Sequence, residues 1–531
     1  MKELFDKYGM LKYAFLAMGG FLTALTLMIP AIGFLEWVTL VPAAIIFILT
    51  ARDGDVKYKK MYFYGFIYYM SFGLSIFHWF INLYPLSFID GMTNFEAAVV
   101  VAAGWVGLSL LQAVFAAFMP VLLALILRKG IIAKHKMAIP LVSAALFTVF
   151  EWMQSLTWAG VPWGRLALGQ TEMPVMLKSA SVLGSYFITF LIVSVNFFIA
   201  LFILMKKEEK REMCIASATG LVALNLLVGG TAMLFDEKEG ETVKAAAIQV
   251  NVSSHDKWGG GQLITTMRKI EKYSLEAAAS GAKLIVLPET VFPYDLFNST
   301  TIYEFITDLA VRCDATIVVG GFTEGEELDE NSLVFVHPDG SVDKTIYSKR
   351  HLVPFGEYVP LRDLVIAIIP PLADISMLSE DLAPGTDSSV VDTEVGRIGS
   401  LICFDSIYEM LALDSARDGA EIIVLSTNDS WFLDSAAVYM HNAQAKIRAV
   451  ETGRYIVRSA NTGISSIITP SGVVLDEEPP LVDGIAMADV AVRQCATAYS
   501  VIGNAFVYVL LAGIVFLVAS KKILTIFQKM V

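Results

Sequence analysis

Gly399-Ser-Leu-Ile-Cys-Phe-Asp405 is an apolar run that ends on a cysteine. The run has the composition of a buried strand with Cys403 at its end, and a helix is expected to follow from about residue 406. Layered α/β folds expose their reactive groups at such strand ends. The start of the following helix would lower the pKa of the thiol.

Two further phrases have the same form. Leu284-Ile-Val-Leu-Pro-Glu-Thr290 carries Glu289, and Tyr347-Ser-Lys-Arg-His-Leu-Val-Pro-Phe-Gly-Glu-Tyr-Val-Pro360 carries Lys349. Taken singly, the three residues have ordinary interpretations as a buried structural cysteine, a helix-capping carboxylate and a solvated lysine. Together they supply a nucleophile, a base and a cation, and this combination favours covalent acyl chemistry.

The three phrases lie in a segment where strand and helix patterns alternate, which predicts a layered α/β domain. Helices are expected near 262–280, 301–313, 406–418 and 436–452. Strands are expected near 243–250, 284–287, 316–320, 333–337, 397–403, 421–426 and 455–460.

The remainder of the chain is much more apolar. Of the 531 residues 56% are hydrophobic, and the mean hydropathy of +0.62 is too high for a soluble protein of this length. A bilayer core requires roughly 20 apolar residues per helix. Eight stretches qualify, at about 11–29, 32–50, 61–83, 98–127, 138–156, 175–205, 213–235 and 500–520. We therefore expect seven transmembrane helices in 1–238, the α/β domain in 239–497, and an eighth helix with a tail in 498–531.

The lysines and arginines of the connecting loops predict the orientation. They gather before the first span, in loops 51–60, 128–137 and 206–212, and in the tail. The alternate loops have none around residue 30 and in 84–97, and only Arg165 in 157–174. If eight helices alternate, every basic loop falls on one side, which the positive-inside rule makes the cytoplasm. The α/β domain is then extracytoplasmic.

The net charge of −13 conceals an acidic centre, because residues 236–499 hold 19 basic and 40 acidic residues. Such a domain is not expected to bind nucleic acid. The four cysteines lack metal-ligand spacing, so no zinc site is expected. Cys313 and Cys495 are either two buried thiols or a disulfide. The histidines of the domain are interpreted as surface or core residues: His255, His337, His351 and His441.

Residues 361–383 form an apolar segment that is interrupted by Pro370-Pro371 and too short to cross a membrane. Two interpretations are open: a surface loop folded onto its own domain, or an arm that dips into the membrane interface near the site.

The three phrases resemble the Glu-Lys-Cys triad of the nitrilase superfamily. Their flanks, and several residues of the apolar half, resemble the bacterial apolipoprotein N-acyltransferases over essentially the whole chain. The departures lie next to the nucleophile, at Asp405, Glu409 and Leu433, where the family usually has Glu, a Pro-Glu pair and Gly. The residues that carry the resemblance are His351-Leu-Val-Pro-Phe-Gly-Glu-Tyr-Val-Pro360, Thr427-Asn-Asp-Ser-Trp-Phe432, Arg458-Ser-Ala-Asn-Thr-Gly463, Glu151-Trp152, Gly160-Val-Pro-Trp163, Gln170 and Gly184.

The resemblance implies a bacterial inner-membrane protein with a helical bundle of about eight spans and an inserted extracytoplasmic, nitrilase-like α-β-β-α sandwich. A fatty acyl chain of a phosphatidylethanolamine-like phospholipid would form a thioester with Cys403. It would then pass, in a ping-pong cycle, to the N-terminal amine of the diacylglyceryl-cysteine of a prolipoprotein, without any metal or organic cofactor.

The resemblance also implies roles for individual residues. Glu289 would serve as general base and then acid, and Lys349 would stabilise the oxyanion. Supporting roles would fall to Glu357, Phe404, Asp405 and Trp431.

Two other classes of function are open. A membrane-tethered amidase would use the same triad, but it has no need of eight spans. A non-catalytic scaffold or a transporter is the other alternative. Transporters place ionisable residues within their spans, whereas Glu36, Glu151 and Lys178 all fall near predicted span ends.

Overall fold

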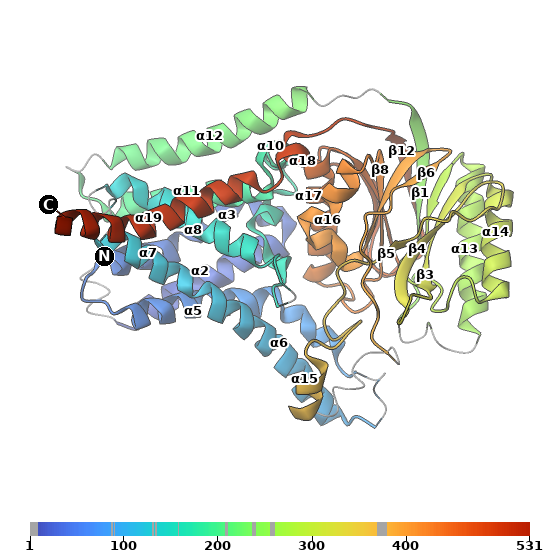
Figure 1. Cartoon of the computed structure of the whole chain (residues 1–531), viewed down its shortest axis with the longest axis horizontal. Helices are drawn as coiled ribbons and strands as arrows, with labels where there is room; N and C mark the ends of the chain where they lie inside the picture. Colours follow the sequence, from blue (N-terminus) through green and yellow to red (C-terminus); the bar gives the residue numbers. More distant parts are fainter. Residues whose placement is uncertain are drawn as a thin grey trace. The chain divides into compact units, whose positions relative to one another are not determined.

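The computed structural model describes residues 9–530 except 87, 88, 90, 130, 131, 133, 134, 158, 208–210, 236–239, 255, 256, 258–260 and 369–379; of Lys129 and 520–530 it describes the backbone alone. The chain forms two compact units (Figure 1). The helical unit contains Met1–Ile81, Val101–Leu234 and Ile502–Val531, and the α/β unit contains Asn82–Val100 and Phe235–Val501.

The helical unit is a bundle of apolar helices joined by short turns. In it α2 packs along α5, and α8 packs along α11. Its longer helices are α2 (Leu11–Met28), α4 (Val41–Arg52), α5 (Tyr58–Ile76), α6 (Asn94–Ala116, from Val101 onward), α7 (Phe118–Lys129), α8 (Ile139–Met153), α11 (Ser185–Leu204), α12 (Glu212–Leu234) and α19 (Ala505–Met530). Shorter elements are η1 (Pro30–Leu35), α3 (Glu36–Thr39), η6 (Leu166–Gln170), α9 (Pro174–Leu177) and α10 (Ala180–Leu183).

Within the described ranges, six segments are long and apolar enough to cross a membrane, and they coincide with six of the eight predicted spans: Leu11–Met28, Pro30–Arg52, Asn94–Arg128, Lys136–Met153, Ser185–Leu204 and Glu212–Leu234. The other two predicted spans fall on α5 and α19. The five tyrosines and two lysines of α5 reduce its hydropathy, and the apolar part of α19, Ala505–Ala519, is shorter than a span. The total of eight spans therefore stays a prediction.

Buried polar contacts fix the segment around η6 inside the helical unit. The amide of Gln170 donates to Glu36 Oε2 at 2.9 Å and accepts from the indole of Trp37 at 2.9 Å. Glu151 accepts from the hydroxyl of Thr189 at 2.6 Å and from the N–H of Leu166 at 3.0 Å. These contacts give Glu151 and Gln170, two residues that carry the family resemblance, a structural role.

The α/β unit contains two six-stranded sheets, ordered β12-β1-β2-β3-β4-β5 and β11-β10-β9-β8-β7-β6. In each sheet three consecutive strands are parallel, namely β1, β2 and β3 in one and β7, β8 and β9 in the other. The strands are β1 (Thr242–Gln249), β2 (Leu284–Val286), β3 (Thr316–Thr323), β4 (Glu330–Val336), β5 (Tyr347–Ser348), β6 (Val391–Thr393), β7 (Gly396–Ile402), β8 (Ile422–Thr427), β9 (Tyr455–Ala460), β10 (Ser465–Ile468), β11 (Val474–Glu478) and β12 (Gly484–Ala491).

The two sheets pack face to face and helices cover their outer faces, which gives the predicted α-β-β-α sandwich (Figure 1). The inner layer joins side chains of both sheets, such as Val286 and Phe335 with Ile402 and Val424. The outer helices are α13 (Gln262–Ala279) and α14 (Thr300–Cys313) on one sheet, and α16 (Glu409–Arg417) and α17 (Ala436–Thr452) on the other. Further short elements are η9 (Cys403–Ile407) and α18 (Ala498–Ile502).

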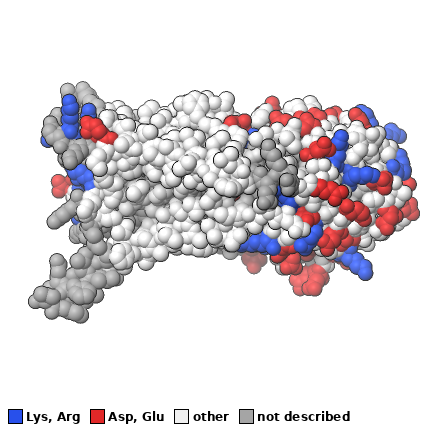
Figure 2. Space-filling view, turned by 90° about the horizontal axis from the view of Figure 1, so that it is seen from above, with Lys and Arg blue, Asp and Glu red and all other residues white. Residues whose placement is uncertain are grey.

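The two units differ in surface chemistry (Figure 2). In that view the face of the helical unit is almost free of charged side chains over most of its length, whereas acidic and basic side chains cover the α/β unit. This difference fits an apolar unit suited to lipid and an α/β unit suited to water.

The structure also bears on the predicted disulfide alternative and on the apolar segment 361–383. Cys313 and Cys495 are both free thiols, so the disulfide alternative is wrong. Arg362–Ile368 in the apolar segment forms a short helix, α15, and Arg362 makes a two-pronged ion pair with Asp381 at 2.7 and 3.0 Å. Ile369 and Pro370-Pro371 lie outside the described residues, so the choice between loop and arm stays open.

Candidate active site

Glu289 lies in the turn directly after β2, at the carboxyl end of the parallel strands. This turn passes so close to β3 that a Cβ at Gly320 would collide with the carbonyl oxygen of Pro288. Gly320 therefore allows the turn to bring Glu289 inward. The carboxylate is only 5% exposed, and a charge in such a place requires partners.

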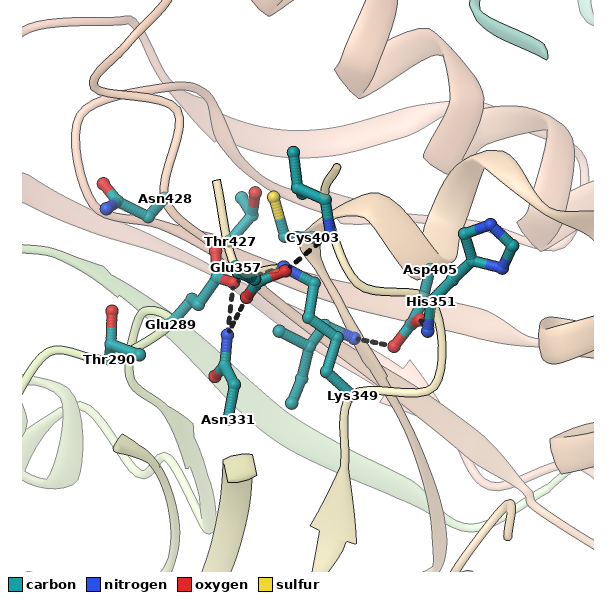
Figure 3. A network of polar contacts seen from close by, with 12 residues as sticks. Glu289, Thr290, Asn331, Lys349, His351, Glu357, Cys403, Asp405, Thr427 and Asn428 are labelled. Carbon is teal, nitrogen blue, oxygen red and sulfur yellow. Dashed lines mark hydrogen bonds and ion pairs between the residues drawn. The ribbon is translucent and has the colours of Figure 1, made fainter. Parts of the chain in front are cut away.

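The partners of Glu289 are Lys349 and Asn331 (Figure 3). Lys349 Nζ, 1% exposed, donates to Glu289 Oε1 at 2.9 Å and to Glu357 Oε1 at 3.0 Å. The amide nitrogen of Asn331 donates to the same two oxygens, at 2.9 and 2.8 Å. Two buried carboxylates thus share two donors.

The two neighbouring carboxylates keep Lys349 protonated. Burial alone would lower the pKa of Lys349, but the carboxylates of Glu289 and Glu357 outweigh burial and hold the pKa well above its ordinary value. Glu357 is itself fixed, because its second oxygen accepts from the N–H of Val353 at 2.8 Å. Lys349 is therefore a permanent, positioned cation.

Cys403 is the first residue of η9, directly after β7, and its φ of +47° is unusual for a residue other than glycine. Burial, followed by the Glu289 carboxylate, raises the pKa of the half-buried thiol above its ordinary value; Lys349 and a hydrogen bond with Thr427 act in the opposite sense. The expectation of a lowered thiol pKa is wrong. The element after Cys403 is a single 3₁₀ turn, and α16 begins only at Glu409.

Of the predicted supporting residues, Asp405 has the clearest role. It is fully buried and accepts hydrogen bonds from Tyr347 Oη at 2.8 Å, from His351 N at 2.8 Å and from Ile402 N at 3.1 Å. These bonds join the end of β7 to the segment that carries Lys349. Burial raises the pKa of Asp405 to about 6, although Lys349 and the three donors favour its ionised form.

The two aromatic supporting residues, Phe404 and Trp431, are both half-buried. Phe404 is half-buried and makes an edge contact with Tyr408, at a centroid distance of 5.5 Å. Trp431 is half-buried in the loop that follows β8. The structure therefore brings Glu289, Lys349, Glu357 and Asp405 into the neighbourhood of Cys403, with Phe404 adjoining the cysteine.

A second buried network contacts the backbone of Cys403. His441 Nδ1 lies 2.7 Å from Asp429 Oδ1, and His441 Nε2 lies 3.2 Å from the carbonyl oxygen of Cys403. Arg458 donates to Asp429 Oδ2 at 2.6 Å. Burial alone would raise the pKa of Asp429, but His441 and Arg458 outweigh burial and lower it. A Cβ at Gly463 would collide with Asp429, so this network needs the glycine that ends the Arg458–Gly463 motif.

One sulfur, nitrogen and oxygen atom of Cys403, His441 and Asp429 lie within 4.8 Å of one another, which is close enough to hold a metal ion. Both oxygens of Asp429 are already engaged, one by His441 and Thr427 and the other by Arg458. A metal ion would have to displace these partners from a buried carboxylate, and it would lie beside a guanidinium. The arrangement suits a support for the cysteine backbone better than a metal site.

Sequence reasoning missed several residues of this neighbourhood. Asn331 carries no local signal, because a polar residue in β4 is ordinary. His441, one of the histidines interpreted as surface or core residues, is a core residue, but its contact with the Cys403 carbonyl was not predicted. Lys257 was also missed: its Nζ donates to Thr290 Oγ1 at 2.9 Å, and burial lowers its pKa to about 8.

Comparison with known proteins gives two family matches. Residues 244–499 match the carbon-nitrogen hydrolase family, and residues 19–198 match the apolipoprotein N-acyltransferase N-terminal domain. The apolipoprotein N-acyltransferase of Geobacter metallireducens is 29% identical over 519 residues, which cover 96% of this chain and 95% of the relative. The chain belongs to the apolipoprotein N-acyltransferase family.

Other relatives show the same pattern. The apolipoprotein N-acyltransferase of Gloeobacter violaceus is 27% identical over 455 residues, covering 85% of this chain and 83% of the relative. Among solved structures, Saccharomyces cerevisiae Nit3 of the nitrilase superfamily is 22% identical, with a TM-score of 0.37, and covers 47% of this chain and 90% of its own. The two family matches and the curated relatives confirm the resemblance found in the sequence motifs: the chain joins an apolipoprotein N-acyltransferase N-terminal domain to a carbon-nitrogen hydrolase domain.

Proposed function

We propose that the protein transfers a fatty acyl chain from a phosphatidylethanolamine-like phospholipid to the N-terminal amine of the diacylglyceryl-cysteine of a prolipoprotein. Family membership supports the reaction class. One observation carries the assignment of residues: a buried, permanently charged Lys349 between Glu289 and Glu357, next to a half-buried cysteine at a strand end.

In the first half-reaction Glu289 takes the proton of the Cys403 thiol as the sulfur attacks the ester carbonyl of the phospholipid. A general base is needed because the raised pKa of Cys403 keeps the resting sulfur protonated. Lys349, with the N–H of Phe404 as second donor, stabilises the oxyanion of the tetrahedral intermediate. The carbon–oxygen bond then breaks, and the lysophospholipid leaves with the proton held by Glu289.

In the second half-reaction the free amine of the acceptor attacks the thioester carbonyl. Glu289 takes a proton from the amine and returns it to the sulfur of Cys403 as the carbon–sulfur bond breaks. The product is an amide, and the enzyme returns to its starting state. No electron transfer or metal is required for either step.

The surrounding residues keep the three reacting groups in place. Asn331 and Glu357 align Glu289 with Lys349. Asp405 ties the Lys349 segment to the end of β7. His441, held by Asp429, fixes the Cys403 carbonyl and with it the strained backbone of the nucleophile. We assign these as positioning roles.

The proposal includes a location in the bacterial inner membrane, with eight spans and the α/β unit outside the cytoplasm. The distribution of lysine and arginine in the loops supports this orientation. Reporter fusions after residues 55, 132 and 209 are expected to report the cytoplasm, and fusions after 90, 168 and 300 the outside. A cytoplasmic signal at 300 would remove the lipoprotein substrate from reach and overturn the proposal.

The chemical test is mass spectrometry of the purified full-length protein after incubation with phosphatidylethanolamine. An acyl mass on the Cys403 peptide, released by hydroxylamine, is expected, and addition of a diacylglyceryl peptide should transfer it. Cys403→Ser should lose the adduct, whereas Cys495→Ala, a change at another half-buried thiol of the same unit, should keep it. Hydrolysis of small amides without an acyl adduct would favour the amidase instead.

A further inference from the structure

A cavity of about 450 Å³ lies in the α/β unit apart from the site described above. Arg397, Arg417 and Arg454 line it, together with Gln494, Ser500 and Val501. Arg397 lies near the start of β7 and Cys403 follows the end of that strand. Six residues of extended strand span roughly 20 Å. The cavity is therefore at the opposite end of the parallel strands from the proposed nucleophile.

Three guanidinium groups in one cavity are unexpected in this part of the chain, where residues 236–499 carry 40 acidic and 19 basic residues. Arg397 pairs with Asp392 through Nε at 3.1 Å, which leaves its terminal nitrogens to the cavity. Neither Arg417 nor Arg454 has a carboxylate within ion-pair distance among the described residues. Arginine forks of this kind match the geometry of a phosphate.

The arginines are held in place by the fold. Arg454 is 3% exposed and donates through Nε to the carbonyl of Ala420 at 2.6 Å. Arg417 donates through Nε to the carbonyl of Ser500 at 2.7 Å. A Cβ at Gly419 would collide with the guanidinium of Arg397, so the glycine leaves room for that group. Each arginine thus uses some of its donors on the protein and keeps others for a ligand.

The position of the cavity in the chain indicates the source of the anion. Ser500 and Val501 line it, and Val501, which is 71% exposed, precedes the first residue of α19 by four positions. In the proposed function α19 crosses the membrane. A cavity at this point of the chain would meet lipid headgroups, where basic side chains attract anionic phospholipids.

We propose that the cavity binds the phosphate of an anionic phospholipid such as phosphatidylglycerol. Arg397 and Arg417 would supply the exposed forks, and Arg454 the buried one. This lipid is not the acyl donor, because its site lies at the other end of β7. It would fasten the α/β unit to the membrane surface at the start of α19. The inference rests on the membrane placement of α19 in the proposed function.

The test uses the full-length protein in a non-ionic detergent, with retention of added lipid measured by native mass spectrometry. Phosphatidylglycerol should be retained in preference to phosphatidylcholine, and salt should weaken its retention. Arg397→Gln combined with Arg417→Gln should weaken it by tenfold or more, since hydrogen bonds to charged groups are lost. Arg268→Gln on α13, an exposed arginine of the same unit, is the matched control and should have no effect.

Three outcomes would overturn the inference. The double variant could retain phosphatidylglycerol as well as the unchanged protein does, or the protein could retain phosphatidylcholine as well as phosphatidylglycerol. Inorganic phosphate at the same concentration could displace phosphatidylglycerol, which would indicate a free-anion site. The single change Arg417→Gln, on an exposed side chain, decides the question if the double variant does not fold. Cys403→Ala should bind phosphatidylglycerol normally. The result therefore does not depend on whether Cys403 forms a thioester.

Discussion

Asn331 provides a sharp test of the proposed mechanism, because it touches both carboxylates and takes no part in bond formation. Its amide nitrogen lies 2.9 Å from Glu289 Oε1 and 2.8 Å from Glu357 Oε1, and the side chain is 2% exposed. Since ionised carboxylates only accept hydrogen bonds, the nitrogen must be the atom that faces them. Asn331→Leu keeps the volume and removes both donors.

The contacts set the size of the effect. A hydrogen bond to a charged group contributes about 1.5–3 kcal/mol. If the loss of the bond to Glu289 appears fully in the barrier, thioester formation slows by about 10- to 10²-fold. Asn331→Asp should be worse, because it places a third carboxylate around the single cation of Lys349, and like charges at this distance cannot all stay ionised.

The assay is the rate at which the acyl mass appears on the Cys403 peptide. Asn442→Leu is the matched control, because Asn442 is also a buried amide, 4% exposed, that accepts from Ser466 at 2.8 Å and, within the described part of the chain, has no hydrogen bond to a carboxylate. It should lose stability and keep the rate. If Asn331→Asp is as fast as Asn331→Leu, or either is as fast as the unchanged protein, the assignment of Glu289 and Lys349 as a paired base and cation is refuted.

Three other outcomes are expected. Glu289→Gln should stop acyl transfer, yet it should speed the alkylation of Cys403 by iodoacetamide at pH 8. Burial is the largest cause of the raised thiol pKa and the Glu289 carboxylate is the second, so the loss of that carboxylate increases the thiolate fraction. Slower alkylation would contradict this. Lys349→Ala should lower the transfer rate by about 10²-fold or more, which is the effect of removing one oxyanion donor. Lys349→Arg should recover only part of this rate, because a planar guanidinium differs from the point charge of an ammonium group; full recovery would show that charge alone suffices. If residues 361–383 are an arm at the membrane interface, Val365→Asp combined with Ile366→Asp should reduce the transfer from long-chain donors more than it reduces the alkylation of Cys403 by iodoacetamide. Equal losses of both reactions would mean that the segment belongs to the core, and no loss of either would mean that it is a surface loop.

The sequence predicted the elements whose residues carry a strong local pattern. The strands expected near 284–287, 397–403 and 421–426 correspond to β2, β7 and β8 of the sandwich. These are central strands, buried on both faces, and they read as continuous apolar runs. The helices α13, α14 and α17 were also within a few residues of their expected positions.

The elements that sequence reasoning did not predict are short or lie at a sheet edge. β5 has two residues and β6 has three, too few to show a period. β11 carries the acidic run Asp476-Glu-Glu478 on an exposed edge, where apolar alternation is not required. Such strands exist because a neighbour offers hydrogen bonds, and this information comes from tertiary structure alone.

The pKa of the Cys403 thiol likewise depends on tertiary structure that the sequence pattern does not reveal. A cysteine before a helix predicts a lowered pKa only if the dipole of a long helix acts on an accessible sulfur. Here one 3₁₀ turn follows the cysteine, the thiol is buried, and after burial the Glu289 carboxylate contributes most to raising its pKa. In the proposed mechanism the sulfur therefore stays a thiol until Glu289 takes its proton. Such a resting thiol reacts only slowly with water-soluble electrophiles, and in the proposed mechanism it becomes a nucleophile when an ester carbonyl enters the position between Cys403 and Lys349. An enzyme of this kind must hold a reactive group in contact with abundant lipid, and coupling the proton transfer to substrate entry gives it a physical basis for selectivity. Glu289→Gln would measure this coupling directly, because acyl transfer should stop while alkylation of Cys403 becomes faster.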